Sequence, residues 1–173
     1  PFEFIDNVMD VISKTPQHTY QLLTKRAERM AEYFSSRLIP QNVWLGVTVE
    51  DTLTKYRIDF LRNLSAQVKF LSCEPLLCDL GELDLEGVDW IIVGGESGPI
   101  ARPMKEEWVL NIKRQAEQKS IPFFFKQWGT WSKEGVKGNK KKNGKLLQGE
   151  VIQQMPKVVH ENFRNKDQTK FWE

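Results

Sequence analysis

The hydrophobic positions along the chain alternate between helix-like and strand-like spacing. Apolar residues recur at intervals of three and four in four segments, which predicts helices over 5–12, 27–34, 53–64 and 103–116. Short runs rich in β-branched and aromatic residues lie between or after them and predict strands over 18–24, 42–49, 67–72, 89–95 and 121–128. Residues 75–88 have no helical period, so we expect this connection to be irregular.

The order of these elements indicates an α/β fold. Strict alternation of helices and strands predicts a parallel sheet with right-handed crossovers, and the nearly continuous apolar strands suggest that both faces are covered. A complete eight-fold barrel usually needs about 250 residues, which leaves a partial (β/α) barrel of the TIM type or an open doubly wound sheet. Because the first predicted element is a helix and the chain opens at Pro1, we expect the fold to be truncated at its N-terminus.

The alternating pattern stops after residue 128. We therefore expect three parts: a partial α/β barrel over 1–131, a basic loop with a small hairpin over 132–156, and a charged tail over 157–173. The dipeptide Asn143-Gly144 favours a type I′ turn, which places the hairpin within 136–153.

Charge is distributed unevenly. The net charge of the chain is +2, but residues 133–149 hold six lysines and one glutamate, so that segment is +5 and the remainder is −3. This argues against a globally basic nucleic-acid-binding protein and for a local basic loop. Mean hydropathy is −0.49, and no apolar run approaches the ~18 residues that span a bilayer. No signal peptide is visible, and we expect a cytoplasmic protein.

Metal and disulfide chemistry have few candidate residues. Cys73 and Cys78 are the two cysteines, and His18 and His160 are the two histidines. Two thiols five positions apart make neither a disulfide framework nor a C-x-x-C zinc site, and an iron–sulfur cluster needs more thiolates. We therefore assign no metal ligand in this chain.

Charged and polar residues follow all five predicted strands. Ligands of parallel α/β folds bind at the carboxyl ends of the strands, so these residues are expected to share one rim. We predict Glu96 and Lys126 as catalytic candidates, and the predicted ligand contacts are Lys25, Arg26, Glu50, Glu74, Gly94, Gly95, Ser97 and Arg102. A mixed-sign rim suits a zwitterionic or polyhydroxylated ligand, or acid–base chemistry. The alternative is that charges at strand ends simply pair with one another where the strands emerge into water.

The glycines of "DWIIVGGESGPIARPM" (89–104) do not form a recognised phosphate loop. Their spacing is G-G-x-x-G rather than G-x-G-x-x-G, and no G-K-[ST] follows. Two glycines do permit a sharp turn and a close approach of a ligand. Using Glu96 as the base of a hydrolase or transferase is a weaker hypothesis, because no G-x-S-x-G elbow is present.

The basic loop offers an alternative function. Lys140, Lys141 and Lys142 could contact phosphates while Trp131 stacks on a base, which would make this a non-catalytic nucleic-acid-binding protein. Lysine-rich loops are more often solvated surface, and Trp131 could instead pack as a cap over the sheet.

Several longer motifs resemble an uncharacterised family of phage and bacterial proteins with a three-cysteine motif, itself similar to the radical S-adenosylmethionine (SAM) enzymes. The motifs are "TPQHTYQLLTKRAERM", "VWLGVTVE", "FLSCEPLL", "DWIIVGGESGPIARPM", "IPFFFKQWG" and "GKLLQGEVIQQMP", which together span roughly residues 1–156. The resemblance implies the C-terminal part of a partial (β/α)₆ barrel, with SAM and a 4Fe-4S cluster as cofactors. The cluster cysteines of that family lie upstream and are absent here. By this resemblance the strand ending in Glu50 would contact the cofactor, and this part alone would be inactive.

Overall fold

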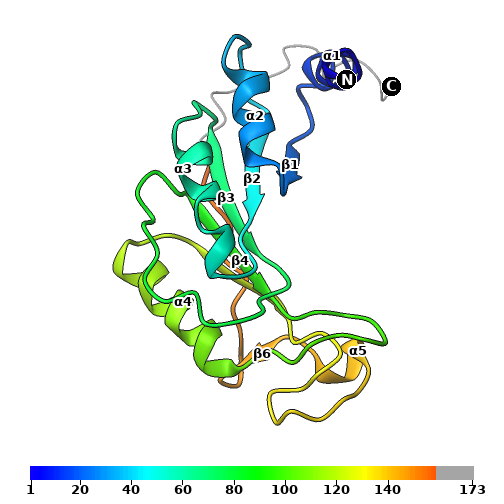
Figure 1. Ribbon diagram of the computed structural model, residues 1–173, viewed down its shortest axis with the longest axis vertical. Coiled ribbons are helices and arrows are strands. Elements are labelled where there is room, and N and C mark those ends of the chain that lie inside the picture. Colours follow the sequence, from blue (N-terminus) through cyan, green and yellow to red (C-terminus); the bar gives the residue numbers. More distant parts are fainter. Residues whose placement is uncertain (159–173) are drawn as a thin grey trace, which may run out of the picture.

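The computed structural model describes residues 1–158 and is built on one parallel sheet (Figure 1). The five strands pair in sequence order, β1-β2-β3-β4-β5, and every pairing is parallel. Their bounds are β1 Tyr20–Thr24, β2 Val43–Thr48, β3 Val68–Cys73, β4 Trp90–Gly94 and β5 Phe123–Gln127. The α/β class and the parallel sheet predicted from the sequence are thus confirmed.

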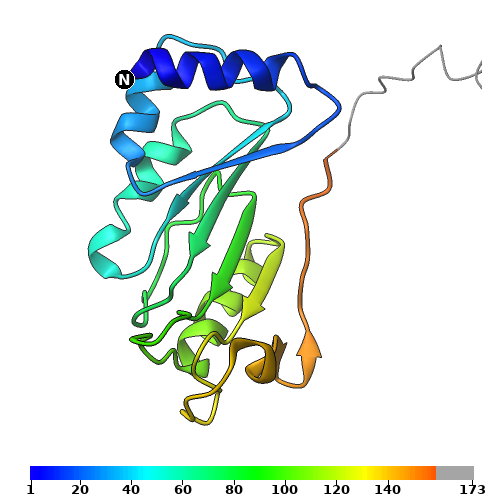
Figure 2. The ribbon, with the colours of Figure 1, turned by 90° about the vertical axis from the view of Figure 1, so that its right-hand side faces the viewer.

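Helices cover one face of the sheet. They are α1 Phe2–Ser13, α2 Ala27–Phe34, the 3-10 turn η1 Thr52–Thr54, α3 Arg57–Arg62 and α4 Glu106–Gln118. Buried side chains of α1 to α4 form a single core with the residues of β2 to β5 that point to the same side, such as Leu45, Leu71 and Ile91. Figure 1 shows α2, α3 and α4 along one side of the sheet, and in Figure 2 they lie behind it, with α1 across one end. A doubly wound sheet, with helices on both faces, is therefore excluded for the described residues.

An aromatic layer covers the opposite face. Trp44, Phe70 and Trp90 are buried there, and Phe124 packs against them. The segment 152–158, orange in Figure 2, runs beside β5 on this side. It pairs with β5 in antiparallel fashion through residues 152–154, and Trp90 Nε1 donates a hydrogen bond to the carbonyl of Gln154 at 2.9 Å. We call residues 152–158 the strap.

The β3–β4 connection is irregular, as the sequence predicted for 75–88. It contributes Leu76, Leu80 and Leu83 to the helix-side core. The Gln115 side chain on α4 holds it through the amide of Leu83 and the carbonyl of Gly81. Hydrogen bonds from a neighbouring helix thus satisfy part of the backbone of this connection, which has no helix of its own.

Two predicted helices differ in detail. The segment predicted over 53–64 is divided into η1, whose N-terminus is held by a capping box of Asp51 and Thr54, and α3, which begins at Arg57. Pro103 does not lie in the first turn of a helix as predicted, because α4 begins at Glu106.

The hairpin also differs from the prediction. Its strands are β6 Leu146–Leu147 and β7 Glu150–Val151, and its turn is formed by Gln148 and Gly149, both with positive φ. Gly144, at φ +69°, instead follows the short helix α5 Lys140–Asn143. A left-handed glycine ends helices as readily as it forms hairpin turns, which the dipeptide alone does not distinguish.

None of the helices within residues 1–158 is long and apolar enough to cross a membrane. Most of the predicted charged tail, residues 159–173, lies outside the described residues.

Candidate functional site

The carboxyl ends of the strands bring six of the predicted residues into one rim. We define the carboxyl rim as Lys25, Glu50, Glu74, Glu96, Arg102 and Lys126. Each of its carboxylates binds at least one cation of the rim.

Glu74 follows β3 directly, and its carboxylate lies over Gly94 at the end of β4. A Cβ on Gly94 would come within 2.7 Å of Glu74 Oε1, so this position requires glycine while the carboxylate lies there. Glu74 Oε2 accepts a hydrogen bond from Lys126 Nζ at 2.9 Å. Glu74 Oε1 is buried and has no hydrogen-bond partner among residues 1–158. A buried acceptor without a partner has lost its hydration without replacement, so a donor from a ligand would be favourable there.

Lys126 reaches Glu74 from an irregular position. The pairing of β4 with β5 shifts register after Val93, and Lys126 is the extra residue of the resulting β-bulge. Bulges redirect side chains and are common beside functional sites. The bulge explains how a lysine on an edge strand meets a carboxylate from two strands away.

Glu50 is fully engaged by cations. Its Oε1 accepts from Lys25 Nζ at 2.7 Å, and its Oε2 accepts from Arg57 Nη1 at 2.8 Å. Arg57 also donates to the carbonyl of Thr48, and the side chains of Glu50 and Arg57 are each only 12% exposed. Both oxygens of this carboxylate are therefore already satisfied.

Glu96 is held by Arg102 alone. The guanidinium donates from Nε and Nη2 at 2.9 Å each, and the backbone amide of Arg102 donates at 2.8 Å. These bonds are the main reason that the pKa of Glu96 falls to about 2, with the charge of Lys25 adding to the effect. A carboxylate with so low a pKa is a weak proton acceptor at neutral pH, so this geometry suits fixing the 96–102 turn better than general-base catalysis.

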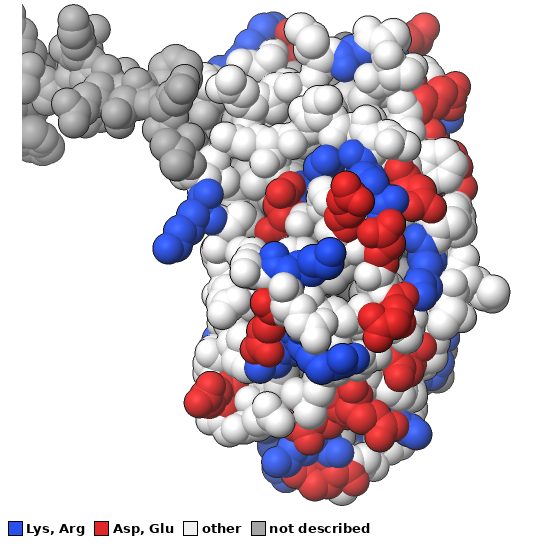
Figure 3. Space-filling view, turned by 90° about the vertical axis from the view of Figure 1, so that its left-hand side faces the viewer, with Lys and Arg blue, Asp and Glu red and all other residues white. Residues whose placement is uncertain are grey.

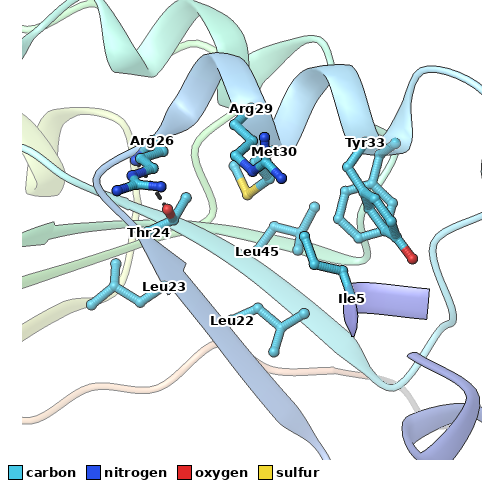
Figure 4. A pocket seen from close by; sticks show the side chains of 10 residues that line it. Ile5, Leu22, Leu23, Thr24, Arg26, Arg29, Met30, Tyr33 and Leu45 are labelled. Atoms are coloured by element: carbon cyan, nitrogen blue, oxygen red, sulfur yellow. Dashed lines mark hydrogen bonds between the residues drawn. The ribbon is translucent and has the colours of Figure 1, made fainter. Parts of the chain in front are cut away.

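The other predicted contacts take separate positions. Ser97 Oγ lies 3.5 Å from Gln127 Nε2 at the exposed edge of the rim. Gly95 is needed for packing, because a Cβ there would collide with the carbonyl oxygen of Trp128. The Arg26 side chain does not join the rim. It lines a hollow of about 270 Å³ between α1, β1 and α2, whose walls are mostly apolar (Figure 4).

Sequence analysis missed three residues of this region: Arg57, Thr48 and Ser72. Thr48 and Ser72 are buried and pair with each other across β2 and β3. Each lies two positions before a rim carboxylate, so the period of two along a strand was the available signal. No local pattern in the sequence marks Arg57 as a partner of Glu50, because a turn separates the two residues and Arg57 begins a new helix.

Neither cysteine belongs to a possible metal-binding group within residues 1–158. Burial raises the pKa of the Cys73 thiol to about 12, with the charges of Glu74 and Glu50 adding to the shift. Within residues 1–158, no three His, Cys, Asp or Glu side chains are grouped so that they could hold a metal ion.

Residues 133–149, which we call the basic segment, are hydrogen-bonded to residues 128–130, which follow β5. Asn143 Nδ2 donates to the carbonyls of Gly129 and Thr130, and the amide of Trp128 donates to the carbonyl of Gly144. Trp131 is half-buried, and its Nε1 donates to the carbonyl of Ala101 at 2.6 Å. Its predicted role in stacking on a base is untested, and this bond shows that it also has a packing role. The side chain of Lys140 lies outside the described part of the structure.

The helix-covered face of the molecule carries charges of both signs. On the face formed by α3, α4 and the 75–88 connection, acidic and basic side chains are interspersed (Figure 3). A surface attracts nucleic acid over a wide area when positive charges gather on it. Within residues 1–158, this face has no such concentration of positive charge (Figure 3).

Comparison with known proteins gives one match. The model of a family described as a protein of unknown function, DUF5131, matches residues 1–156. No curated protein and no solved structure matches the chain.

Proposed function

The chain belongs to the DUF5131 family, and we propose that its carboxyl rim binds a small zwitterionic or polyhydroxylated ligand. The observation that carries this proposal is the partnerless, buried Oε1 of Glu74. An N–H or O–H of the ligand would bind this oxygen, and an anionic group of the ligand would bind Lys126.

The other carboxylates support this choice of Glu74. Glu50 has two cationic partners, and Glu96 has three hydrogen bonds from Arg102. Binding a ligand at either of them would require breaking an existing charged hydrogen bond. Glu74 Oε1, in contrast, has no partner among residues 1–158 and can accept a new hydrogen bond.

We also propose that the sheet is an arc of a (β/α) barrel, forming the C-terminal part of a phage-related, radical SAM-like protein. The support is the sequential strand order with helices on one face, which is the arrangement of neighbouring strands in such barrels. In that architecture the carboxyl rim is where ligands bind.

The residues of this chain do not fit an iron–sulfur cluster. Cys73 is buried with a raised pKa, and Cys78 is the only other cysteine. Cluster binding needs several accessible thiolates, which these two cysteines do not supply. SAM itself remains a suitable probe, because its methionine part is zwitterionic and its ribose carries hydroxyl groups.

The test is titration calorimetry of the full chain with SAM, S-adenosylhomocysteine, methionine and adenosine. We expect at least one zwitterionic probe to bind and Glu74→Gln to weaken it about tenfold or more, since a charged hydrogen bond is lost. Gly94→Ala should do the same, because the new methyl group displaces the Glu74 carboxylate.

The matched control is Glu107→Gln on α4, where the side chain is 71% exposed, pairs with Lys105 and binds none of the rim residues. It should bind the probes as the wild type does. Absence of binding by every probe, or equal weakening by the Glu74 and Glu107 variants, would refute the proposal. Circular dichroism of each variant checks that it is folded.

A further inference from the structure

A second hollow adjoins the carboxyl rim. It has a volume of about 490 Å³, in the range of small-molecule sites. Its lining comes from the end of β5 and from the basic segment: Lys126, Gln127, Asn139, Lys141, Gly144 and Lys145. We call it the lysine hollow. Lys126 belongs to both the hollow and the rim, so the two sites are contiguous.

The charge of the lysine hollow is poorly compensated. Lys126 has Glu74 as its partner, and Lys145 Nζ donates to the neutral Gln153 Oε1 at 2.8 Å. Among residues 1–158, no carboxylate lies within ion-pair distance of Lys141 or Lys145. Like charges gathered without counter-charges repel each other, and an anion would relieve that repulsion.

The hollow is held by the fold rather than formed by a loose loop. Its wall is fixed by the bonds of Asn143 to Gly129 and Thr130, and by the indole of Trp128, which donates to the carbonyl of Leu146 at 2.8 Å. The amide of Gly138 also donates to Thr130 at 2.7 Å. A preformed arrangement of cations binds an anion with less loss of conformational entropy.

The helical turn α5 separates the lysines of the basic segment. Successive residues of a helix point about 100° apart, so Lys141 and Lys142 face different ways. Lys142 lines another hollow, with Lys133, Lys137 and Glu134. Lys140, Lys141 and Lys142 were predicted together as a nucleic-acid contact. The structure describes the side chains of Lys141 and Lys142, and these two line different hollows.

We propose that the lysine hollow is a binding site for a phosphate group. A phosphate has several acceptor oxygens and up to two negative charges, which match three lysines and the side-chain amides of Asn139 and Gln127. The group could belong to a phosphorylated small molecule or to a nucleic-acid strand. This proposal goes beyond ligand binding at the carboxyl rim and does not depend on it.

The test compares two double variants of equal charge change. Lys141→Ala with Lys145→Ala removes cations from the lysine hollow, whereas Lys133→Ala with Lys142→Ala removes them from the other hollow. Binding of adenosine monophosphate is measured by calorimetry, and binding of a fluorescent single-stranded oligonucleotide by anisotropy at two salt concentrations.

We expect the lysine-hollow variant to lose about tenfold or more in affinity and the other variant to bind as the wild type does. Binding of the nucleotide would identify a small-molecule source, and binding of the oligonucleotide alone, with a steep salt dependence, would identify nucleic acid. Equal weakening by both double variants, or no binding of either probe to the wild type, would overturn the proposal.

Glu74→Gln separates this site from the carboxyl rim. It leaves all three lysines of the hollow in place and should not weaken phosphate binding. Failure of one proposal is thus visible independently of the other.

Discussion

At the scale of single residues, three carboxylates with similar positions in the sequence have three different surroundings. Glu50 and Glu96 have all their oxygens bound by cations or amides, and Glu74 has one buried oxygen without a described partner. Sequence placed all three at the same rim, and it gave no means to rank them. The ranking depends on Arg57 and Arg102, which come from a helix and a loop rather than from the strand ends.

The Glu96–Arg102 pair predicts a pH effect. The pKa of Glu96 is lowered from 4.5 to about 2 in the folded chain, mainly by hydrogen bonds from Arg102. The pair therefore contributes stability above the ordinary pKa, and this contribution is lost as pH falls through the lowered value. Glu96→Gln should lower the melting temperature at neutral pH, and the difference from wild type should close towards about pH 2.

Thermal melts followed by circular dichroism over this pH range check the prediction. Glu107→Gln, which also removes one carboxylate, is the control and should differ little from wild type at either end. A Glu96→Gln difference that grows on acidification would contradict the assigned direction of the shift.

At the scale of elements, most helices and strands were predictable because their apolar spacing is local information. The misses have local physical causes of their own. A capping box of Asp51 and Thr54 starts the separate turn η1 ahead of α3, and Gly144 ends a helical turn where the sequence suggested a hairpin. The side of the sheet that each residue faces was not predictable, since both faces are apolar in β2 and β3.

Gly46 on β2 lies on the face of the sheet that the aromatic layer covers, and its packing there predicts the effect of a substitution. A Cβ at this position would collide with the ring of Phe70 on β3. Gly46→Ala should therefore lower the free energy of unfolding by about 1–3 kcal/mol, as overpacking of a core does. Urea denaturation measures this difference.

A second substitution tests the cause. Phe70→Leu creates space beside Gly46, so the double variant should lose less stability than the sum of the two single variants. Strictly additive losses would mean that Gly46 and Phe70 do not share this contact.

At the scale of the whole molecule, the sheet is covered unequally. Helices close one face, and an aromatic layer with the strap closes part of the other. The apolar strands indicated that both faces of the sheet are covered. The strap, which covers part of the aromatic face, comes after the last strand in the sequence and has neither helical nor strand-like hydrophobic spacing. The same holds for the candidate sites, where the strand ends were predictable and the partners from distant segments were not.

The strap predicts that proline substitutions at two neighbouring positions differ in their effect on stability. The backbone amide of Gln154 donates to the carbonyl of Phe123 at 3.1 Å, whereas the backbone amide of its neighbour Gln153, which forms the bridge to Phe124, donates no hydrogen bond to β5. Gln154→Pro should reduce the free energy of unfolding by about 1–3 kcal/mol, because it removes this donor and also the Gln154 Oε1 that accepts from the amide of Phe123 at 3.0 Å. Gln153→Pro is the matched control and should cost clearly less. Equal losses in urea denaturation would show that the strap is not held by this bond.

The strap also sets an order of events during synthesis. A ribosome makes β1 to β5 before residues 152–158, so the aromatic layer of Trp44, Phe70 and Trp90 is complete before its cover exists. Exposed apolar surface on a nascent chain is the kind that chaperones bind and that aggregates form from. A stalled or prematurely terminated chain lacking the strap would therefore present this layer to the cell, even with all five strands already made.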